Sequence, residues 1–533
     1  MYQCSNCNGN LVFDIASQNL QCAYCSTQYD PYEMDQTIHA NEMDTMDVTV
    51  YTCSQCGGEL YTTDTSMTSF CSFCGTEALL YSRASKEQKP EYIIPFKKTK
   101  EDCKQLYKKM MRMAIFAPKE LKDEKCIDSF RGIYMPYWMY DVNHEKPMDV
   151  AGETSHRSGD YIYTSHYRLT ADLDVHYNGI SYDGSSSFSD NISEKIAPFQ
   201  VAHLKPFTPA YMSGFYADTA DVDESVYCED VTRFANDKTG EFIRKHPDCK
   251  KYEISQESID MDLGNAIERT HRAMFPVWFM SYQKDGRVTY ATVNGQTGKV
   301  VADLPVDLGK YLIGTFALAL PIFILLNMFL TVTPGVLLSV VSGIAAFVSV
   351  LYAIEIGKIV KRDNYEDDKG KQSKIKQDMN VEQKKVKGAT MSKEVKTVLI
   401  VVGATILISF VSQFLIISEV LVAEIFGVSS LSVIVCGVTL IISIAALVFS
   451  NISAKKLNAT IKGRSSVFCM IATLIALLIA ILNPVHDAFY YIGAMAGLAA
   501  VFATLLDLIK KYNVLATRRL PQFDYTGGDN NAY

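Results

Sequence analysis

The chain opens with Cys4-Ser5-Asn6-Cys7 and, after fourteen residues, Cys22-Ala23-Tyr24-Cys25. The pattern returns as Cys53-Ser54-Gln55-Cys56 and Cys71-Ser72-Phe73-Cys74, with every cysteine 49 positions after its counterpart. A tetrahedral zinc site needs four soft ligands, and paired C-x2-C turns supply two thiolates each. We therefore predict two structural Zn2+ ions, whose ligands are Cys4, Cys7, Cys22 and Cys25 in the first site and Cys53, Cys56, Cys71 and Cys74 in the second.

The residues that follow Cys7 and Cys56 suit a metal-binding turn. They are Asn8-Gly9 and Gly57-Gly58, and asparagine and glycine reach positive φ at low cost. Disulfides or free thiols are the alternative, but regular spacing in duplicate favours zinc. We expect zinc ribbons at 1–30 and 51–82, joined by a linker or short helix at 31–50. Each ribbon is too small for a full hydrophobic core, so its metal supplies folding energy.

The first 82 residues contain no Lys or Arg and ten acids, from Asp14 to Glu77. Binding to a phosphate backbone depends on Lys and Arg, so a nucleic-acid partner is disfavoured. A protein-contact role, or a purely structural one, fits these ribbons better. Eight of the 14 cysteines belong to the two quartets, and this metal-type usage indicates a reducing compartment. Residues 1–30 also lack the basic start and apolar core of a cleavable signal peptide.

Residues 90–308 predict a β-rich α+β domain. A short strand at 92–96 precedes a helix that begins at Thr99, where Asp102 suits a capping box. Residues 161–177 alternate between apolar and polar side chains, which predicts a long half-buried strand or hairpin. Residues 219–236 predict an acidic amphipathic helix.

The chain has two tryptophans, Trp138 and Trp278, and each lies two residues after a proline in a similar apolar phrase. Two interpretations remain open, a duplicated subdomain or two convergent edge strands. The domain contains no nucleophile elbow around Ser185–Ser187 and no Walker A motif at Gly298-Lys299. We therefore predict no catalytic and no cofactor-binding residue, and no enzyme.

The last part of the chain, 311–509, predicts an all-α six-helix transmembrane bundle. Its apolar runs lie at 311–332, 335–354, 398–417, 430–450, 466–483 and 488–508, each near the ~20 residues that a bilayer requires. Basic connections alternate with base-free ones, so the positive-inside rule puts both termini, the tail 510–533 and the basic loop 358–396 in the cytoplasm.

The loop 358–396 has twelve Lys and Arg against seven acids, a net charge of +5. It is either a solvated segment near anionic lipid or a docking partner for the acidic ribbons. The spans carry Asp, Glu, Lys and Arg only near their ends, which disfavours an ion-coupled transporter. Gly493 and Gly497 form a G-x3-G step, which is typical of helix packing.

Several stretches together resemble one family of uncharacterised bacterial twin zinc-ribbon, multi-pass membrane proteins, common in Gram-positive bacteria. They are the ribbons, Tyr92-Ile93-Ile94-Pro95-Phe96, Gly132-Ile133-Tyr134-Met135-Pro136-Tyr137-Trp138, Val293-Asn294-Gly295-Gln296-Thr297-Gly298-Lys299-Val300 and Arg518-Arg519-Leu520-Pro521. Its members are often labelled by analogy with TFIIB-type zinc ribbons or a primosomal helicase. The resemblance implies no established activity.

Together these features predict a zinc-binding protein of the bacterial inner (plasma) membrane with a cytoplasmic N-terminal half. We expect it to act as a protein-interaction scaffold or regulator, with an unknown protein partner and the lipid bilayer as its surroundings. The alternative is a transporter or lipid-handling protein that the soluble half regulates. A polar cavity enclosed by the six helices would favour that alternative, and a tightly packed bundle would favour an anchor.

Overall fold

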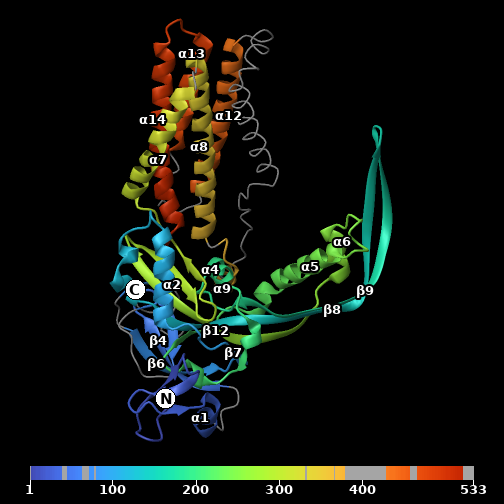
Figure 1. The fold of residues 1–533 in the computed structure, drawn as a ribbon, viewed down its shortest axis with the longest axis vertical. Helices are drawn as coiled ribbons and strands as arrows, with labels where there is room; N and C mark the ends of the chain where they lie inside the picture. Colours follow the sequence, from blue (N-terminus) through green and yellow to red (C-terminus); the bar gives the residue numbers. More distant parts are fainter. Residues whose placement is uncertain are drawn as a thin grey trace.

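The computed structural model describes residues 2–38, 45–62, 71–76, 80–329, 333–364, 366–378, 428–455 and 465–519. The molecule is elongated (Figure 1), with the N-terminal ribbon at one end, a sheet domain in the middle and apolar helices at the other end. The first ribbon is a separate three-stranded antiparallel sheet of β1 (Leu11–Asp14), β2 (Asn19–Cys22) and β3 (Gln28–Tyr29). Helix α1 (Pro31–Ile38) follows it.

The sheet domain is built on a 12-stranded sheet. Eight of its strands follow the order β10-β7-β12-β8-β11-β5-β4-β6, and the other four are β9, β13, β14 and β15. Its strands are β4 (Thr45–Cys53), β5 (Glu59–Thr62), β6 (Leu80–Gln88), β7 (Tyr92–Ile93), β8 (Arg131–Ser158), β9 (Tyr161–Asp183), β10 (Lys205–Pro206), β11 (Tyr216–Asp218), β12 (Ile267–Lys284), β13 (Arg287–Asn294), β14 (Val300–Ala302) and β15 (Arg518–Arg519). The helices around it are α2 (Lys100–Met113), α3 (Glu124–Asp128), α4 (Asp190–Ile196), α5 (Cys228–Lys245) and α6 (Gln256–Leu263), with 3-10 turns at Glu120–Lys122, Val201–His203, Pro209–Met212 and Glu224–Tyr227.

Several expected boundaries change. Residues 45–50, expected in the linker, form the start of β4, because they pair with β5 and β6. The strand at 92–96 is limited to Tyr92–Ile93, and the helix expected at 219–236 is α5, preceded by a 3-10 turn. The capping box at Thr99 and Asp102 is confirmed, and the strand expected at 161–177 is part of β9.

The two tryptophan phrases lie in neighbouring strands at the centre of the sheet, so the edge-strand alternative is wrong. Strands β8 and β12 pair antiparallel with Met135 opposite Phe275. Each also has a short parallel neighbour, which is β11 for β8 and β7 for β12. Strand β8 forms a hairpin with β9, and β12 forms a hairpin with β13. A strand, a helix and a hairpin therefore occur twice, as β7-α2-β8-β9 and β11-α5-β12-β13, around a local two-fold axis.

Hydrogen bonds repeat this symmetry between the two halves. The indole Nε1 of Trp138 donates to Val222 O, and that of Trp278 donates to Lys98 O, both at 2.8 Å. The main-chain N–H groups of Gly184 and Gly295 donate to the carbonyls of the two prolines, Pro136 and Pro276, again at 2.8 Å. Equivalent residues of the two halves therefore make equivalent hydrogen bonds.

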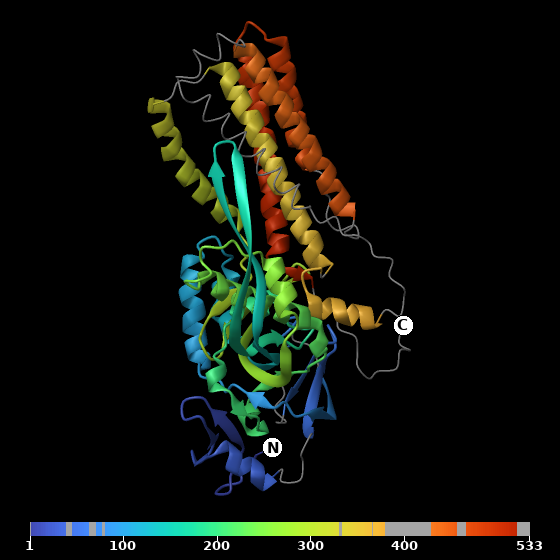
Figure 2. The same ribbon diagram turned by 90° about the vertical axis from the view of Figure 1, so that its right-hand side faces the viewer.

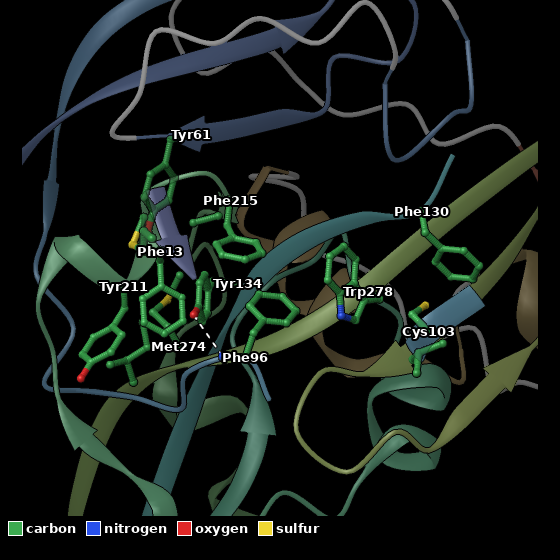
Figure 3. Packing of buried hydrophobic residues seen from close by; sticks show 14 of the residues in the cluster. Phe13, Tyr61, Phe96, Cys103, Phe130, Tyr134, Tyr211, Phe215, Met274 and Trp278 are labelled. Carbon is green, nitrogen blue, oxygen red and sulfur yellow. Dashed lines mark hydrogen bonds between the residues drawn. The ribbon is translucent and has the colours of Figure 1, made fainter. Parts of the chain in front are cut away.

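Aromatic side chains fill the core between the sheet and the ribbon end (Figure 3). Phe96 stacks on Phe215 with ring centroids 4.5 Å apart, and its main-chain N–H donates to the Tyr134 hydroxyl at 3.4 Å. Phe13 of β1 joins the same core through an edge contact with Tyr211. The first ribbon is thus docked on the sheet domain by apolar contacts.

Five helices in the described part of the C-terminal half run roughly parallel (Figure 1). They are α7 (Leu308–Phe329), α8 (Pro334–Asp363), α12 (Val428–Lys455), α13 (Ser466–Leu482) and α14 (Ala488–Leu515). Three segments are long and apolar enough to cross a membrane: α8, 432–455 of α12, and α14. Helix α8 continues beyond the expected end at 354, and the expected span at 398–417 lies outside the described residues.

The described helices pack closely through small residues. A Cβ added to Gly493 of α14 would lie 2.5 Å from Ile479 Cδ1 of α13. One added to Gly497 would lie 2.5 Å from Val341 Cγ1 of α8. The expected packing role of the G-x3-G step is confirmed, because side chains of both neighbouring helices pack directly against the two glycines.

The bundle and the sheet domain meet in a network of charged side chains. Asp303 accepts from Arg518 Nε at 3.2 Å and from Arg362 Nη2 at 3.4 Å, and all three side chains are mostly buried. Residues 510–519, expected in a tail, continue α14 to Leu515 and form β15, which pairs with β13. The bundle is therefore joined to the sheet by backbone pairing as well as by ion pairs.

The described part of the basic loop contacts the sheet domain. It forms helix α9 (Lys369–Asp378), whose first residue bonds Asp190 through its N–H at 2.7 Å and pairs with Asp230 through Nζ. Burial is the main cause that raises the pKa of Asp190. Residues 379–396 lie outside the described residues, so contact between the loop and the ribbons stays a prediction.

Candidate metal centres

Four chain turns of the same shape present the eight cysteines. In each turn the residue after the second cysteine has positive φ: Asn8 (55°), Ser26 (60°), Gly57 (73°) and Gly75 (75°). Its N–H donates to the carbonyl of the first cysteine at 2.8–3.0 Å. The N–H of the first cysteine in turn bonds the carbonyl five residues ahead, also in all four turns. The left-handed residue lets the chain fold back so that both thiols of a turn point to one side.

The sulfur positions suit a tetrahedral ion. The four Sγ atoms of each quartet lie within 4.8 Å of one another. In the second quartet, Cys53 Sγ lies 3.7 Å from Cys74 Sγ, and Cys56 Sγ lies 3.7 Å from Cys71 Sγ. A tetrahedron with Zn–S bonds near 2.3 Å separates its sulfurs by about 3.8 Å, whereas a disulfide needs about 2.05 Å. Both quartets therefore fit a metal ion such as Zn2+, and all eight predicted ligands are brought together as expected.

Hydroxyl groups surround the sulfurs of the first quartet. The Tyr29 hydroxyl lies 3.2 Å from Cys4 Sγ, and the Thr27 hydroxyl lies 3.1 Å from Cys25 Sγ. The hydrogen bond from Tyr29 is the main cause that lowers the pKa of Cys4, and the bond from Thr27 lowers the pKa of Cys25 to about 6. Both contacts favour the thiolate form, which is the form that binds metal.

The second quartet is enclosed by the sheet domain. Its four cysteines are buried, while Cys7 of the first quartet is exposed. Phe73, between Cys71 and Cys74, packs edge-on against Phe279 of β12, and the Thr76 hydroxyl lies 3.0 Å from Gln283 Oε1. Strand β5 pairs with β11. The second ribbon is therefore not a separate lobe but one wall of the domain.

Sequence reasoning missed the hydroxyl groups near the sulfurs. Thr27 and Thr76 each follow the fourth cysteine of a quartet by two residues, and they are themselves 49 positions apart, like the ligands. The Thr76 hydroxyl lies 3.3 Å from Cys74 Sγ. This part of the repeat was visible in the sequence. Tyr29 carried no such signal, because its contact depends on how β3 lies beside the first turn.

Tyr29→Phe removes the hydroxyl near Cys4 and keeps the ring. We expect affinity for zinc at the first site to fall about 10-fold, since partners of metal ligands are worth 10–100-fold in affinity. Competition of the purified full chain with a chromophoric chelator measures this, and the second site serves as internal control. Unchanged release of both ions would show that the Tyr29 contact has no influence on the metal.

The comparison with curated proteins found one protein that is similar to this chain. The curated "Uncharacterized protein YdjG" of Bacillus subtilis (strain 168) is 33% identical over 315 residues, which are 58% of this chain and 91% of that protein. No family model and no solved structure matches.

Proposed function

This chain belongs to the family of Bacillus subtilis YdjG, and we propose that it is a zinc-binding integral membrane protein that serves as a scaffold or regulator for other proteins. The proposal locates it in the bacterial plasma membrane, with six membrane-spanning helices and with both termini in the cytoplasm. Support for the topology comes from the alternation of basic and base-free connections along 311–533. We also propose that the wider family is that of the twin zinc-ribbon membrane proteins.

The observation that carries the scaffold role is the position and surface of the first ribbon. It lies at the end of the molecule opposite the apolar helices (Figure 1), and its Phe13 packs against Tyr211 of the sheet domain. Between the ligands Cys22 and Cys25 it exposes Tyr24, whose side chain is 80% accessible. A rigid aromatic side chain on an acidic, base-free surface suits a protein partner with apolar and basic groups.

Packing in the bundle supports the anchor over the transporter. Side chains of α8 and α13 pack directly against Gly493 of α14, and a side chain of α8 packs against Gly497. Some polar groups at the described interfaces pair with one another, as Ser342 Oγ does with Thr439 Oγ1 at 2.7 Å. Such contacts are typical of closely packed transmembrane helices, and close packing is what an anchor requires.

A photo-crosslinking residue at position 24 tests the scaffold. We expect it to capture one or a few proteins in intact cells, because Tyr24 is the exposed aromatic of the proposed contact surface. The matched control is the same residue at Phe242, which is 58% exposed and belongs to α5, a helix that lies away from the ribbon (Figure 1). Capture should also disappear when Cys7→Ser removes a ligand of the first site.

Two results would contradict the scaffold. One is equal capture at positions 24 and 242, and the other is capture that persists without the first metal site. Flux of a solute through proteoliposomes of the purified chain would instead favour the transporter.

A further inference from the structure

Helix α2 ends in an exposed apolar loop. The buried face of the helix, formed by Cys103, Tyr107 and Met111, belongs to the core of the sheet domain, so the helix is held firmly. At its C-terminal end the side chains of Met113 and Ile115 are 78% and 63% exposed. Single apolar residues on a surface are common, so the meaning of this pair depends on where the loop lies.

The loop is bound to the first two turns of α7. The main-chain N–H of Asp307 donates to the carbonyl of Phe116 at 2.7 Å. The ring of Phe116 meets Tyr311 edge-on with centroids 5.5 Å apart. It also covers Gly314, where an added Cβ would lie 2.7 Å from a ring carbon. Because Ile115 directly precedes Phe116, it lies at the level where the apolar run of α7 begins.

Basic side chains on the helices mark the same level. Asn513 of α14 accepts from the main-chain N–H of Val306 at 2.7 Å and donates to its carbonyl at 2.8 Å, so the end of α14 lies beside the start of α7. Lys510 and Lys511 lie within one turn of this contact, and Lys310 lies in the first turn of α7. Lys and Arg gather at the cytoplasmic ends of spanning helices. A bilayer around these helices would therefore place its headgroups at this level.

Both ribbon views agree with this position. Figures 1 and 2 show α2 ending close to the start of α7, at the boundary between the sheet domain and the apolar helices. The loop is therefore on the side of the sheet domain that faces the bundle.

The surface around the loop combines cations with apolar groups. Lys109 and Arg112 are exposed in the last two turns of α2, and Lys119 is exposed just after the loop. The apolar surface continues onto α7, where Ile313 and Phe316 are 73% and 69% exposed. Apolar side chains flanked by Lys and Arg are typical of segments that lie in the interface of a membrane.

We propose that the loop after α2 enters the interface of the bilayer beside α7 through Met113 and Ile115. The cations Lys109, Arg112 and Lys119 then meet lipid phosphate groups. The contact holds α2, and with it the sheet domain, in a fixed orientation to the membrane. This inference rests on the proposed membrane topology, and it goes beyond the scaffold role because it requires no protein partner.

Tryptophan quenching in proteoliposomes of the full-length chain tests the contact. Ile115→Trp places an indole in the loop, and Phe347→Trp places one at an exposed position in the middle of α8. Tyr24→Trp is the control at the opposite end of the molecule. The vesicles contain phosphatidylcholine and phosphatidylglycerol that carry bromine either near the headgroup or near the chain end. The emission of the wild-type chain, from Trp138 and Trp278, is subtracted.

We expect the indole at position 115 to lose most emission to bromine near the headgroup, and that at position 347 to bromine near the chain end. The indole at position 24 should be quenched by neither. Quenching at position 347 without quenching at position 115 would overturn the loop contact and leave the membrane topology intact. No quenching at position 347 would overturn both. Blue-shifted emission at position 115 without quenching would assign the loop to a protein contact, against the proposal.

Reversal of charge tests the contact with phosphate. In the Ile115→Trp chain, the further changes Lys109→Glu and Arg112→Glu should weaken quenching by bromine near the headgroup, because acids beside the loop are repelled by phosphatidylglycerol. Lys238→Glu on the exposed face of α5 is the control and should leave the quenching unchanged. Equal quenching in all these chains would contradict the contact with phosphate.

Discussion

Cys56→Ser is expected to prevent the sheet domain from folding, whereas Cys7→Ser is expected to unfold only the first ribbon. Structural zinc contributes an apparent ~10–16 kcal/mol in zinc-finger peptides, which is as large as the whole stability of a typical domain at about 5–15 kcal/mol. Cys56 belongs to a quartet enclosed by the sheet, where β5 pairs with β11. Cys7 belongs to the first ribbon, which has a separate three-stranded sheet, and its side chain is exposed.

Zinc content and tryptophan fluorescence separate the two variants. Both tryptophans of the chain lie in central strands of the sheet domain, so their emission reports that domain alone. Each variant should hold at most one ion per chain. Only Cys56→Ser should show the red-shifted emission of exposed indoles without heating. Cys249→Ser, which lies outside both quartets, is the control for loss of a thiol. A cooperative transition of unchanged midpoint in Cys56→Ser would contradict the structural role of the second site.

Asp303→Ala is expected to loosen the junction between the bundle and the sheet domain at a cost of about 3–5 kcal/mol, the usual effect of removing one partner from a buried ion pair. The carboxylate is the shared acceptor for Arg362 and Arg518, and without it two buried guanidinium groups lose their nearest anion. Because β15 is held to β13 beside this carboxylate, we expect β15 to detach first.

Limited trypsin digestion of the detergent-solubilised chain measures this loosening. Cleavage after Arg518 should be much faster in Asp303→Ala than in the wild type. Glu120→Ala is the matched control, because it breaks the exposed pair with Lys284 and exposed pairs contribute only about 0–1 kcal/mol. If both variants were cut at the same rate as the wild type, the network would not hold the two parts together.

The metal ligands were predictable because the information that specifies them is local. A C-x2-C turn brings two sulfurs together by its own geometry, and Gly57 and Asn8 already suit the positive φ that the turn needs. The helices around Gly493 and the strand at 161–177 were predictable for the same reason, since length, hydropathy and alternation are properties of neighbouring residues. The two tryptophan phrases indicated a duplication but left the edge-strand alternative open.

The sequence by itself therefore determined two four-cysteine metal sites, a β-rich middle and long apolar helices. Only the tertiary structure decided that β4 to β6 join the large sheet, that β8 and β12 are related by a local two-fold axis, and that β15 closes the junction with the bundle. The physical reason is that every strand offers the same backbone donors and acceptors, so spacing along the chain does not specify its partner. The partner is selected by what the pairing buries, as Phe73 against Phe279 illustrates, and that depends on residues far apart in the chain.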